Sequence, residues 1–212
     1  MLKMLGSLPL VAIACVTAPA MADDLNPPSW RGQPDSTFQE WTFQPNATSG
    51  PANPGYVNPN GVPTMSASDG GTFWTESFGN RIGVWGLTNG SLNFRVPNDN
   101  DQDAIAKFIW IQVTWFGQVP PLVSGVSSTD HDFSPLGDPQ TIQLADGWMH
   151  TTWQFSLKEC PAFEDIFVSG ATLTGAPIYI DQVVIDTICI VPAPGACGLG
   201  LAGLVLAARR RR

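Results

Sequence analysis

KFIWIQVTWF, residues Lys107 to Phe116, is the stretch of the chain that decides its fold. Apolar residues stand at every second position from Ile109, and the polar residues Gln112 and Thr114 fall on the opposite face. Successive side chains of a β-strand point to opposite faces, so this pattern predicts a strand with one face in a hydrophobic core. The residues on that face are Ile109, Ile111, Val113 and Trp115.

Shorter runs of the same kind occur between Asp23 and Cys189, where no heptad, fixed-period repeat or long helical period is present. The clearest is Thr151 to Leu157, in which aromatic and aliphatic residues alternate with polar ones. About eight antiparallel strands with long crossovers predict an all-β fold, a β-sandwich of jelly-roll type. The other predicted strands are Glu40 to Phe43, Leu92 to Val96, Ile166 to Val168 and Ile178 to Ile188, with Thr72 to Ser77 and Arg81 to Leu87 as a hairpin around Gly79 and Asn80.

Two proline-rich stretches, Gln44 to Thr64 and Gly117 to Gln140, interrupt this pattern, and we expect both to be loops. They are long for a compact domain, which is typical of functional loops or of poorly ordered excursions. The last predicted strand, Tyr179 to Asp186, is similar to the closing strand of carbohydrate-binding jelly rolls. That resemblance implies the same kind of fold.

The charge of the chain is unevenly distributed. Of its ten Lys and Arg residues, Lys3 lies near the N-terminus and Arg209 to Arg212 are the last four residues. Five cations remain for the segment between, against all eighteen Asp and Glu residues, so this segment carries a formal charge of −13. Such an acidic surface repels phosphate backbones, which argues against nucleic acid as a partner and makes divalent cations the more natural counter-ions.

Residues 1–22 have the layout of a secretory signal peptide. One cation is followed by a short apolar run and then by small residues at Ala20 and Ala22. This order predicts export by the general secretion machinery and cleavage before Asp23. The apolar run is too short for a spanning helix. A lipoprotein signal that uses Cys15 is the alternative.

Residues 191–212 combine a Pro-Ala-Pro motif, a short apolar run and a terminal cluster of four arginines. The motif is Pro192, Ala193 and Pro194, and the apolar run from Ala196 to Ala208 has thirteen residues. As a helix this run spans about 20 Å, short of the roughly 30 Å hydrocarbon core of a membrane. It is therefore suited to a transient hold with the arginines on the cytoplasmic side. An ordinary anchor or an apolar tail is the alternative.

This three-part order resembles the PEP-CTERM protein-sorting tail, in the Pro-Ala-Pro variant of planctomycete-like bacteria. Ala193 stands where glutamate is commonest in that family. The resemblance concerns the tail alone, and it implies recognition by an exosortase-type membrane protease and cleavage near the motif. We therefore expect a signal peptide at 1–22, a β-sandwich domain at 23–190 and a sorting signal at 191–212. The protein would be exported to the cell surface or beyond it, after a transient stage at the inner membrane.

Two cysteines, Cys160 and Cys189, remain once the predicted leader and tail are set aside. An even pair in an oxidising compartment predicts a disulfide. The alternative is a reactive thiol, which would need a neighbouring histidine. The chain has two histidines, His131 and His150, and neither is close to a cysteine in sequence.

No nucleophile elbow, zinc spacing, phosphate loop or dinucleotide fingerprint is present in the sequence. Without these motifs we expect a non-catalytic protein with no cofactor. A glycoside hydrolase is an alternative, because two carboxylates suffice for that reaction. Its candidate residues are Glu40, Glu76, Glu159 and Glu164.

An acidic run supplies the candidate metal site. Asp99, Asp101 and Asp103 offer hard oxygen ligands at the spacing with which a calcium loop begins. The glycine and the closing glutamate of an EF-hand are missing, so a turn with solvated carboxylates is the favoured interpretation and a structural Ca²⁺ the alternative. Asp181 and Asp186 are a second candidate pair, by analogy with jelly rolls that bind Ca²⁺ near the closing strand.

The faces opposite the predicted core supply a candidate glycan-binding face. Flat aromatic rings stand there beside amide groups and an imidazole, and sugars need rings to stack on and polar partners for their hydroxyls. The alternative is that the tryptophans lie under the long loops as a secondary core, since tryptophan is mostly buried. The residues of this face are Trp110, Gln112, Trp148, His150 and Gln154.

These observations favour an exported, non-catalytic β-sandwich protein of the cell surface or extracellular matrix. A module that binds envelope or extracellular polysaccharide is the first alternative, and a hydrolase of extracellular polysaccharide is the second.

Overall fold

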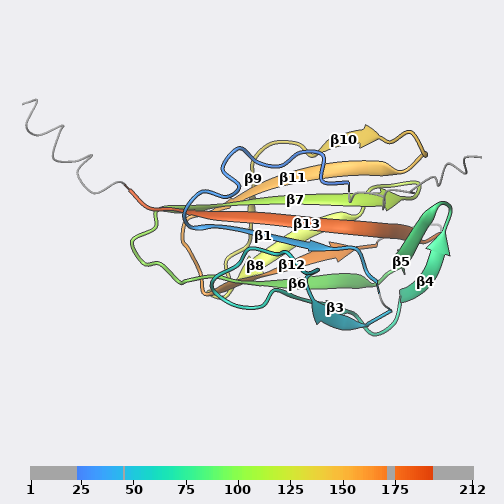
Figure 1. The fold of residues 1–212 in the computed structure, drawn as a ribbon, viewed down its shortest axis with the longest axis horizontal. Coiled ribbons are helices and arrows are strands. Elements are labelled where there is room, and N and C mark those ends of the chain that lie inside the picture. The colour runs from blue at the N-terminus through green and yellow to red at the C-terminus, as the bar shows by residue number, and fades with distance from the viewer. Residues whose placement is uncertain (1–22, 45, 171–174, 193–212) are drawn as a thin grey trace, which may run out of the picture.

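The regular structure of the chain is all β in the computed structural model, which describes residues 23–44, 46–170 and 175–192 (Figure 1). The strands are β1 (Ser36–Trp41), β2 (Ser49–Pro51), β3 (Thr64–Ala67), β4 (Thr72–Phe78), β5 (Arg81–Leu87), β6 (Ser91–Pro97), β7 (Ala106–Phe116), β8 (Leu122–Ser127), β9 (Ser134–Pro135), β10 (Gln140–Gln143), β11 (Met149–Leu157), β12 (Phe163–Ser169) and β13 (Ile178–Ile190). The predicted signal peptide with Ala20 and Ala22, and the tail from Ala193 onward, lie outside the described residues. Within those residues, no helix is long and apolar enough to span a membrane.

The strands form two antiparallel sheets that face one another. The larger sheet runs β10-β11-β7-β13-β5-β4, with β1 also paired to β13 and β9 to β11. The smaller sheet runs β2-β3-β6-β12-β8. From β5 to β8, and again from β11 to β13, consecutive strands alternate between the two sheets. This alternation is that of a jelly roll, so the predicted β-sandwich is confirmed.

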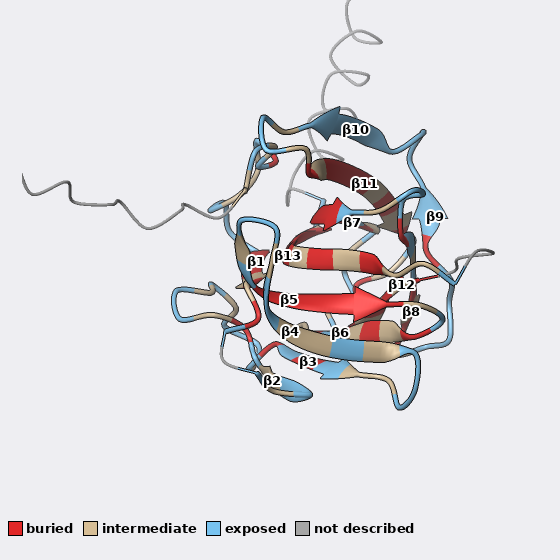
Figure 2. Cartoon of the chain, turned by 90° about the vertical axis from the view of Figure 1, so that its right-hand side faces the viewer, coloured by how far each residue is buried: buried red, intermediate tan, exposed pale blue. Residues whose placement is uncertain are grey.

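The core lies between the two sheets, and β7 is at its centre. Ile109, Ile111 and Val113 of β7 are at most 1% exposed, and their antiparallel partners on β11 also face inward. Phe94 and Ile166 of the smaller sheet are fully buried opposite them. Burying one such side chain contributes about 1.5–3 kcal/mol. Figure 2 shows the buried strands inside, with exposed strands such as β10 at the rim.

The two stretches predicted to be loops contain strands, which corrects that expectation. Gln44 to Thr64 holds β2, and Gly117 to Gln140 holds β8 and β9. β2 and β8 are the two edges of the smaller sheet, and β2 ends on Pro51. An edge strand tolerates proline because one row of its N–H groups has no partner strand. The proline in β2 is therefore compatible with its position at the edge of the sheet.

Cys160 and Cys189 form a disulfide with a Cα–Cα distance of 5.7 Å, as predicted. The bond joins the turn between β11 and β12 to the end of β13, and so links the connection into the smaller sheet with the larger one.

Candidate functional site

The predicted glycan-binding face is largely covered in the structure. Gln112, Trp148 and His150 are only 1–2% exposed, while Trp110 and Gln154 keep partial exposure. The first three cannot contact a ligand in this conformation, so the alternative of a secondary buried layer describes them better.

The N-terminal segment 23–34 provides much of this cover. The backbone N–H of Asn26 donates to Oε1 of Gln112 at 2.8 Å, and its side-chain amide donates to Thr152 at 3.1 Å. Arg31 donates two bonds to Asp186, at 2.5 and 2.6 Å, and contacts Asp24 as well. Burial raises the pKa of Asp186 to about 6, although the bonds from Arg31 oppose that rise. Polar contacts thus hold the segment on the outer face of the larger sheet.

Beyond this segment, three strands place aromatic residues in one row on the outer face, and a fourth strand places a glycine among them. Phe73 of β4 is paired with Gly86 of β5, which is paired with Tyr179 of β13, which is paired with Phe116 of β7. A Cβ at Gly86 would lie 2.3 Å from the ring of Phe73, so the ring lies across this glycine. Phe73 is 42% exposed and Phe116 is 40% exposed.

Phe78, from the end of β4, completes the group. Its ring is stacked on Tyr179 with centroids 3.6 Å apart, and its centroid lies 5.4 Å from that of Phe116. Trp148 lies against both Phe78 and Phe116, at 6.1 and 5.8 Å, and is itself buried. Each such pair contributes about 0.5–1.5 kcal/mol beyond its buried area. We call the residues Phe73, Phe78, Phe116 and Tyr179 the aromatic surface.

Charged groups border the aromatic surface. The guanidinium of Arg81 lies 5.6 Å from the ring centre of Trp148 and pairs with three carboxylates. These are Asp23 at 2.5 Å, Asp146 at 2.8 Å and Asp181 at 3.0 Å. Burial raises the pKa of Asp181 to about 6; Arg81 opposes the rise, and the Asp23 and Asp146 carboxylates add to it. One cation among three carboxylates leaves this border negative.

The candidate calcium ligands contact backbone groups of their own turn or the side chains of arginines. Asp99 and Asp101 accept the backbone N–H of Asp101 and Asp103, at 3.3 and 2.8 Å, as in a solvated turn. Among the described residues, the one cluster of three potential ligand atoms combines Asp99 with the two disulfide sulfurs. Asp181 and Asp186, the second candidate pair, are bound to arginines. The turn with solvated carboxylates and the structural Ca²⁺ both stay predictions.

The four glutamates of the hydrolase alternative have separate environments. Glu164 is fully buried in an ion pair with Lys107. Glu40 accepts a bond from Gln182 at 2.9 Å. Glu159 accepts bonds from Ser127 and His131 at 2.8 and 2.9 Å, and Glu76 is exposed on β4. The pair that a glycoside hydrolase needs stays a prediction.

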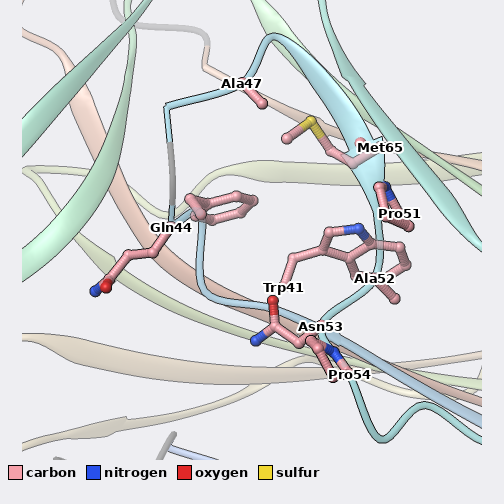
Figure 3. A pocket seen from close by; sticks show the side chains of 10 residues that line it. Trp41, Gln44, Ala47, Pro51, Ala52, Asn53, Pro54 and Met65 are labelled. Carbon is pink, nitrogen blue, oxygen red and sulfur yellow. The ribbon is translucent and has the colours of Figure 1, made fainter.

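An apolar cavity of about 180 Å³ lies between β1 and the loop that carries β2 (Figure 3). Trp41, Phe43 and Met65 form its walls. Among the polar groups that line it, Gln44 donates to the carbonyl of Ile82 and Asn53 bonds with Thr42. The buried Nε1 of Trp41 has no hydrogen-bond partner among the described residues. The cavity offers a ligand few polar contacts, so it suits sugar binding poorly.

Comparison with known proteins adds little. No family model and no curated protein matches the chain. Among solved structures, a family two carbohydrate esterase from Cellvibrio japonicus is similar at 13% identity and a TM-score of 0.24. The match covers 62% of this chain and 36% of the esterase, so this chain spans about a third of its length. So slight a likeness carries no argument about function.

The aromatic surface was not predicted from the sequence. Its four residues come from three strands that are far apart in the chain, and only the cross-strand register brings them together. The sequence signal that was available is the placement of Phe116 and Tyr179 on the polar-facing sides of two predicted strands.

Proposed function

We propose that the protein is an exported, non-catalytic β-sandwich protein of the cell surface or extracellular matrix that binds polysaccharide through the aromatic surface. The observation that carries this proposal is a row of rings across one sheet face, exposed at Phe73 and Phe116 and half-buried between them. Rings arranged along a sheet can stack on successive sugar units of an extended chain.

The exposure of large apolar side chains to water supports the proposal. Phe73 and Phe116 are among the large hydrophobic side chains that the structure leaves exposed to water. Contiguous exposed apolar groups, rimmed by polar ones, mark sites of interaction in soluble proteins. The hydroxyl of Tyr179 and the side chains of Arg81 and Asp146 stand beside the rings as hydrogen-bonding partners for sugar hydroxyls. The site is an open surface, which suits a polymer better than a small molecule.

The predicted signal peptide and sorting tail support the proposed location at the cell surface or in the extracellular matrix. The leader before Asp23 and the tail after Val191 both fit export, and the tail resembles that of proteins sorted by an exosortase. Envelope and extracellular polysaccharides are the polymers that such a protein would meet.

Affinity electrophoresis on gels that contain a soluble polysaccharide tests the proposal. Phe73→Ala and Phe116→Ala should each weaken retention about tenfold or more, because a stacked ring contributes about 1.5–3 kcal/mol when buried. Phe108→Ala is the matched control: it removes a phenylalanine of similar exposure from the same strand, about 26 Å away along β7. The same samples are assayed for released reducing ends, which would favour the hydrolase alternative. Equal retention of all three variants and the wild type would contradict the proposal.

A further inference from the structure

A second cavity lies away from the aromatic surface residues Phe116 and Tyr179, beside the loops that flank β3. It has a volume of about 280 Å³ and is lined by two indoles, Trp74 and Trp85, by Phe73 of the aromatic surface and by polar side chains. Its size suits one sugar ring rather than a polymer, since cavities for larger ligands begin at about 300 Å³.

The polar groups around this cavity are of the kind that bind hydroxyls. Asn46, Thr48 and Asp69 are exposed at its edge. Thr72 donates its hydroxyl hydrogen to the carbonyl of Ser68 at 2.7 Å, which leaves the Thr72 oxygen free to accept. An amide, a carboxylate and hydroxyls next to indole rings are the mixture that a sugar requires.

One buried donor points to an occupant. Trp85 is 2% exposed and lines the cavity, yet its Nε1 has no hydrogen-bond partner among the residues that the structure describes. By contrast, the Nε1 of Trp74 donates to the carbonyl of Phe43 at 3.0 Å. A buried N–H without a partner costs about 1–3 kcal/mol, and a ligand that drew the Trp85 indole toward the cavity would recover part of that cost.

The wall of the cavity is held in place before any ligand binds. Gly70 and Gly71 have φ values of +78° and +70°, a conformation that side-chain-bearing residues rarely adopt. A Cβ at Gly71 would also lie 2.7 Å from the backbone nitrogen of Gly90. Ser68 and Ser91 exchange two hydrogen bonds of 2.9 Å at the same turn. A preorganised turn costs little ordering entropy when a ligand binds.

We infer that this cavity is a binding site for a single neutral sugar unit, with Asp69 and Asn46 accepting from and donating to its hydroxyls and a shift of the Trp85 indole bringing its N–H to a third. The site shares Phe73 with the aromatic surface but contains neither Phe116 nor Tyr179, so it can be tested independently of polysaccharide binding. The sugar is either free in solution or the end unit of a chain, because both present the same hydroxyls.

Titration of the ¹⁵N-labelled protein with D-glucose, D-galactose, D-mannose and N-acetylglucosamine tests the inference. At least one sugar should shift the indole N–H resonance of Trp85 in a saturable manner, with the resonance assigned from Trp85→Phe. Asp69→Ala should weaken that binding about tenfold, because a hydrogen bond to a charged group contributes about 1.5–3 kcal/mol. Asp132→Ala, which removes an exposed aspartate beyond β8, should leave it unchanged.

Tetrasaccharides of the sugar that binds identify the source. Tighter binding than that of the single sugar assigns the site to a chain end, and equal binding assigns it to the free sugar. Phe116→Ala should bind the single sugar as the wild type does, so failure of the aromatic surface leaves this test intact. The inference is overturned if no sugar or tetrasaccharide moves the Trp85 resonance, or if Asp69→Ala binds as the wild type does.

Discussion

Lys107 and Glu164 form a fully buried ion pair that joins the two sheets, with 2.9 Å between Nζ and Oε1. Asn98 bonds to both charged groups, and the sulfur of Cys189 lies 3.7 Å from Nζ. Burial lowers the pKa of Lys107 and raises that of Glu164, while each group opposes the shift of the other. The pair is thus a costly polar contact within the apolar interface, at the end of the sandwich that the disulfide closes.

Removing one member of this pair should destabilise the domain more than removing both. Lys107→Met leaves the Glu164 carboxylate buried without its cation, which costs about 3–5 kcal/mol. In Lys107→Met/Glu164→Leu no uncompensated charge remains, so much of that loss should be recovered. Urea unfolding of the single and double variants measures the difference. A double variant less stable than both single variants would show that the pair stabilises the fold on its own account.

The alternating pattern of the sequence was sufficient for the centre of the fold. Ile109, Ile111 and Val113 face the core as predicted, because a period of two fixes the face of a strand once one residue is known to be buried. The same pattern could not reveal that Lys107, on this face, is fully buried. Its partner Glu164 is 57 residues away, and pairing across two sheets leaves no local signal.

The outer faces were harder to predict for a related reason. A polar residue on the outer face of a sheet is exposed to solvent only if no other segment covers that face. Here Gln112 is covered by the segment that holds Asn26, which is 86 residues earlier in the chain. The alternation of polar and apolar residues in β7 and β11 therefore predicted the strands correctly. It did not predict which of their polar residues are exposed to solvent. Only the cross-strand register shows that rings such as Phe116 lie next to other aromatic residues on one face.

Asp186 should make the protein less stable as the pH rises. Its pKa is about 6 in the folded protein and 3.8 in the unfolded chain, so the folded state binds the proton more readily. Its contribution is therefore most favourable below pH 3.8 and is lost as the pH rises through about 6. The loss is at most about 3 kcal/mol for a shift of this size.

Asp186→Asn isolates this contribution, because asparagine can keep a hydrogen bond with Arg31 and does not titrate. Free energies of unfolding from urea titrations are compared at pH 4, 5, 6 and 7. The stability of the wild type should fall relative to that of the variant across this range. A constant difference between the two proteins would mean that the pKa of Asp186 is the same in the folded and the unfolded chain.

The disulfide should contribute roughly 3–4 kcal/mol. Its two cysteines are 29 residues apart, and in the chain-entropy model closing a loop of that length restricts the unfolded chain by about that amount. Cys160→Ala/Cys189→Ala should lower the midpoint of thermal unfolding, and alkylation of the folded wild type without reduction should label neither sulfur. Full labelling of Cys160 or Cys189 in protein exported by its native host would contradict the bond.

Processing at both ends should leave a mature chain that begins at Asp23 and ends near the Pro-Ala-Pro motif. The side chain of Asp23 is paired with Arg81, so the first residue of the mature chain would lie on the folded domain. Intact-mass measurement on protein from the native host determines both ends in one experiment. Retention of Arg209 to Arg212 in the mature protein would contradict cleavage by an exosortase-type protease.

The aromatic surface should discriminate among polysaccharides by charge. Asp23, Asp146 and Asp181 surround one cation beside it, so a polymer of uronic acids meets repulsion, and a polymer of amino sugars meets attraction. Retention in affinity gels should therefore rank a deacetylated glucosamine polymer above its N-acetylated form, and both above a polyuronate.

Asp146→Asn should reduce the difference in retention between the deacetylated and the N-acetylated polymer by about fivefold, because one charge near a protein surface contributes about 1 kcal/mol. Its control is Asp132→Asn, which removes the same negative charge from the loop after β8 and should leave the ranking unchanged. Added salt should weaken the preference, since exposed charges are screened beyond about 10 Å at 0.1 M. Equal retention of the amino, acetylated and acidic polymers, together with the loss of all three in Phe116→Ala, would show that the rings bind and that the carboxylates do not select.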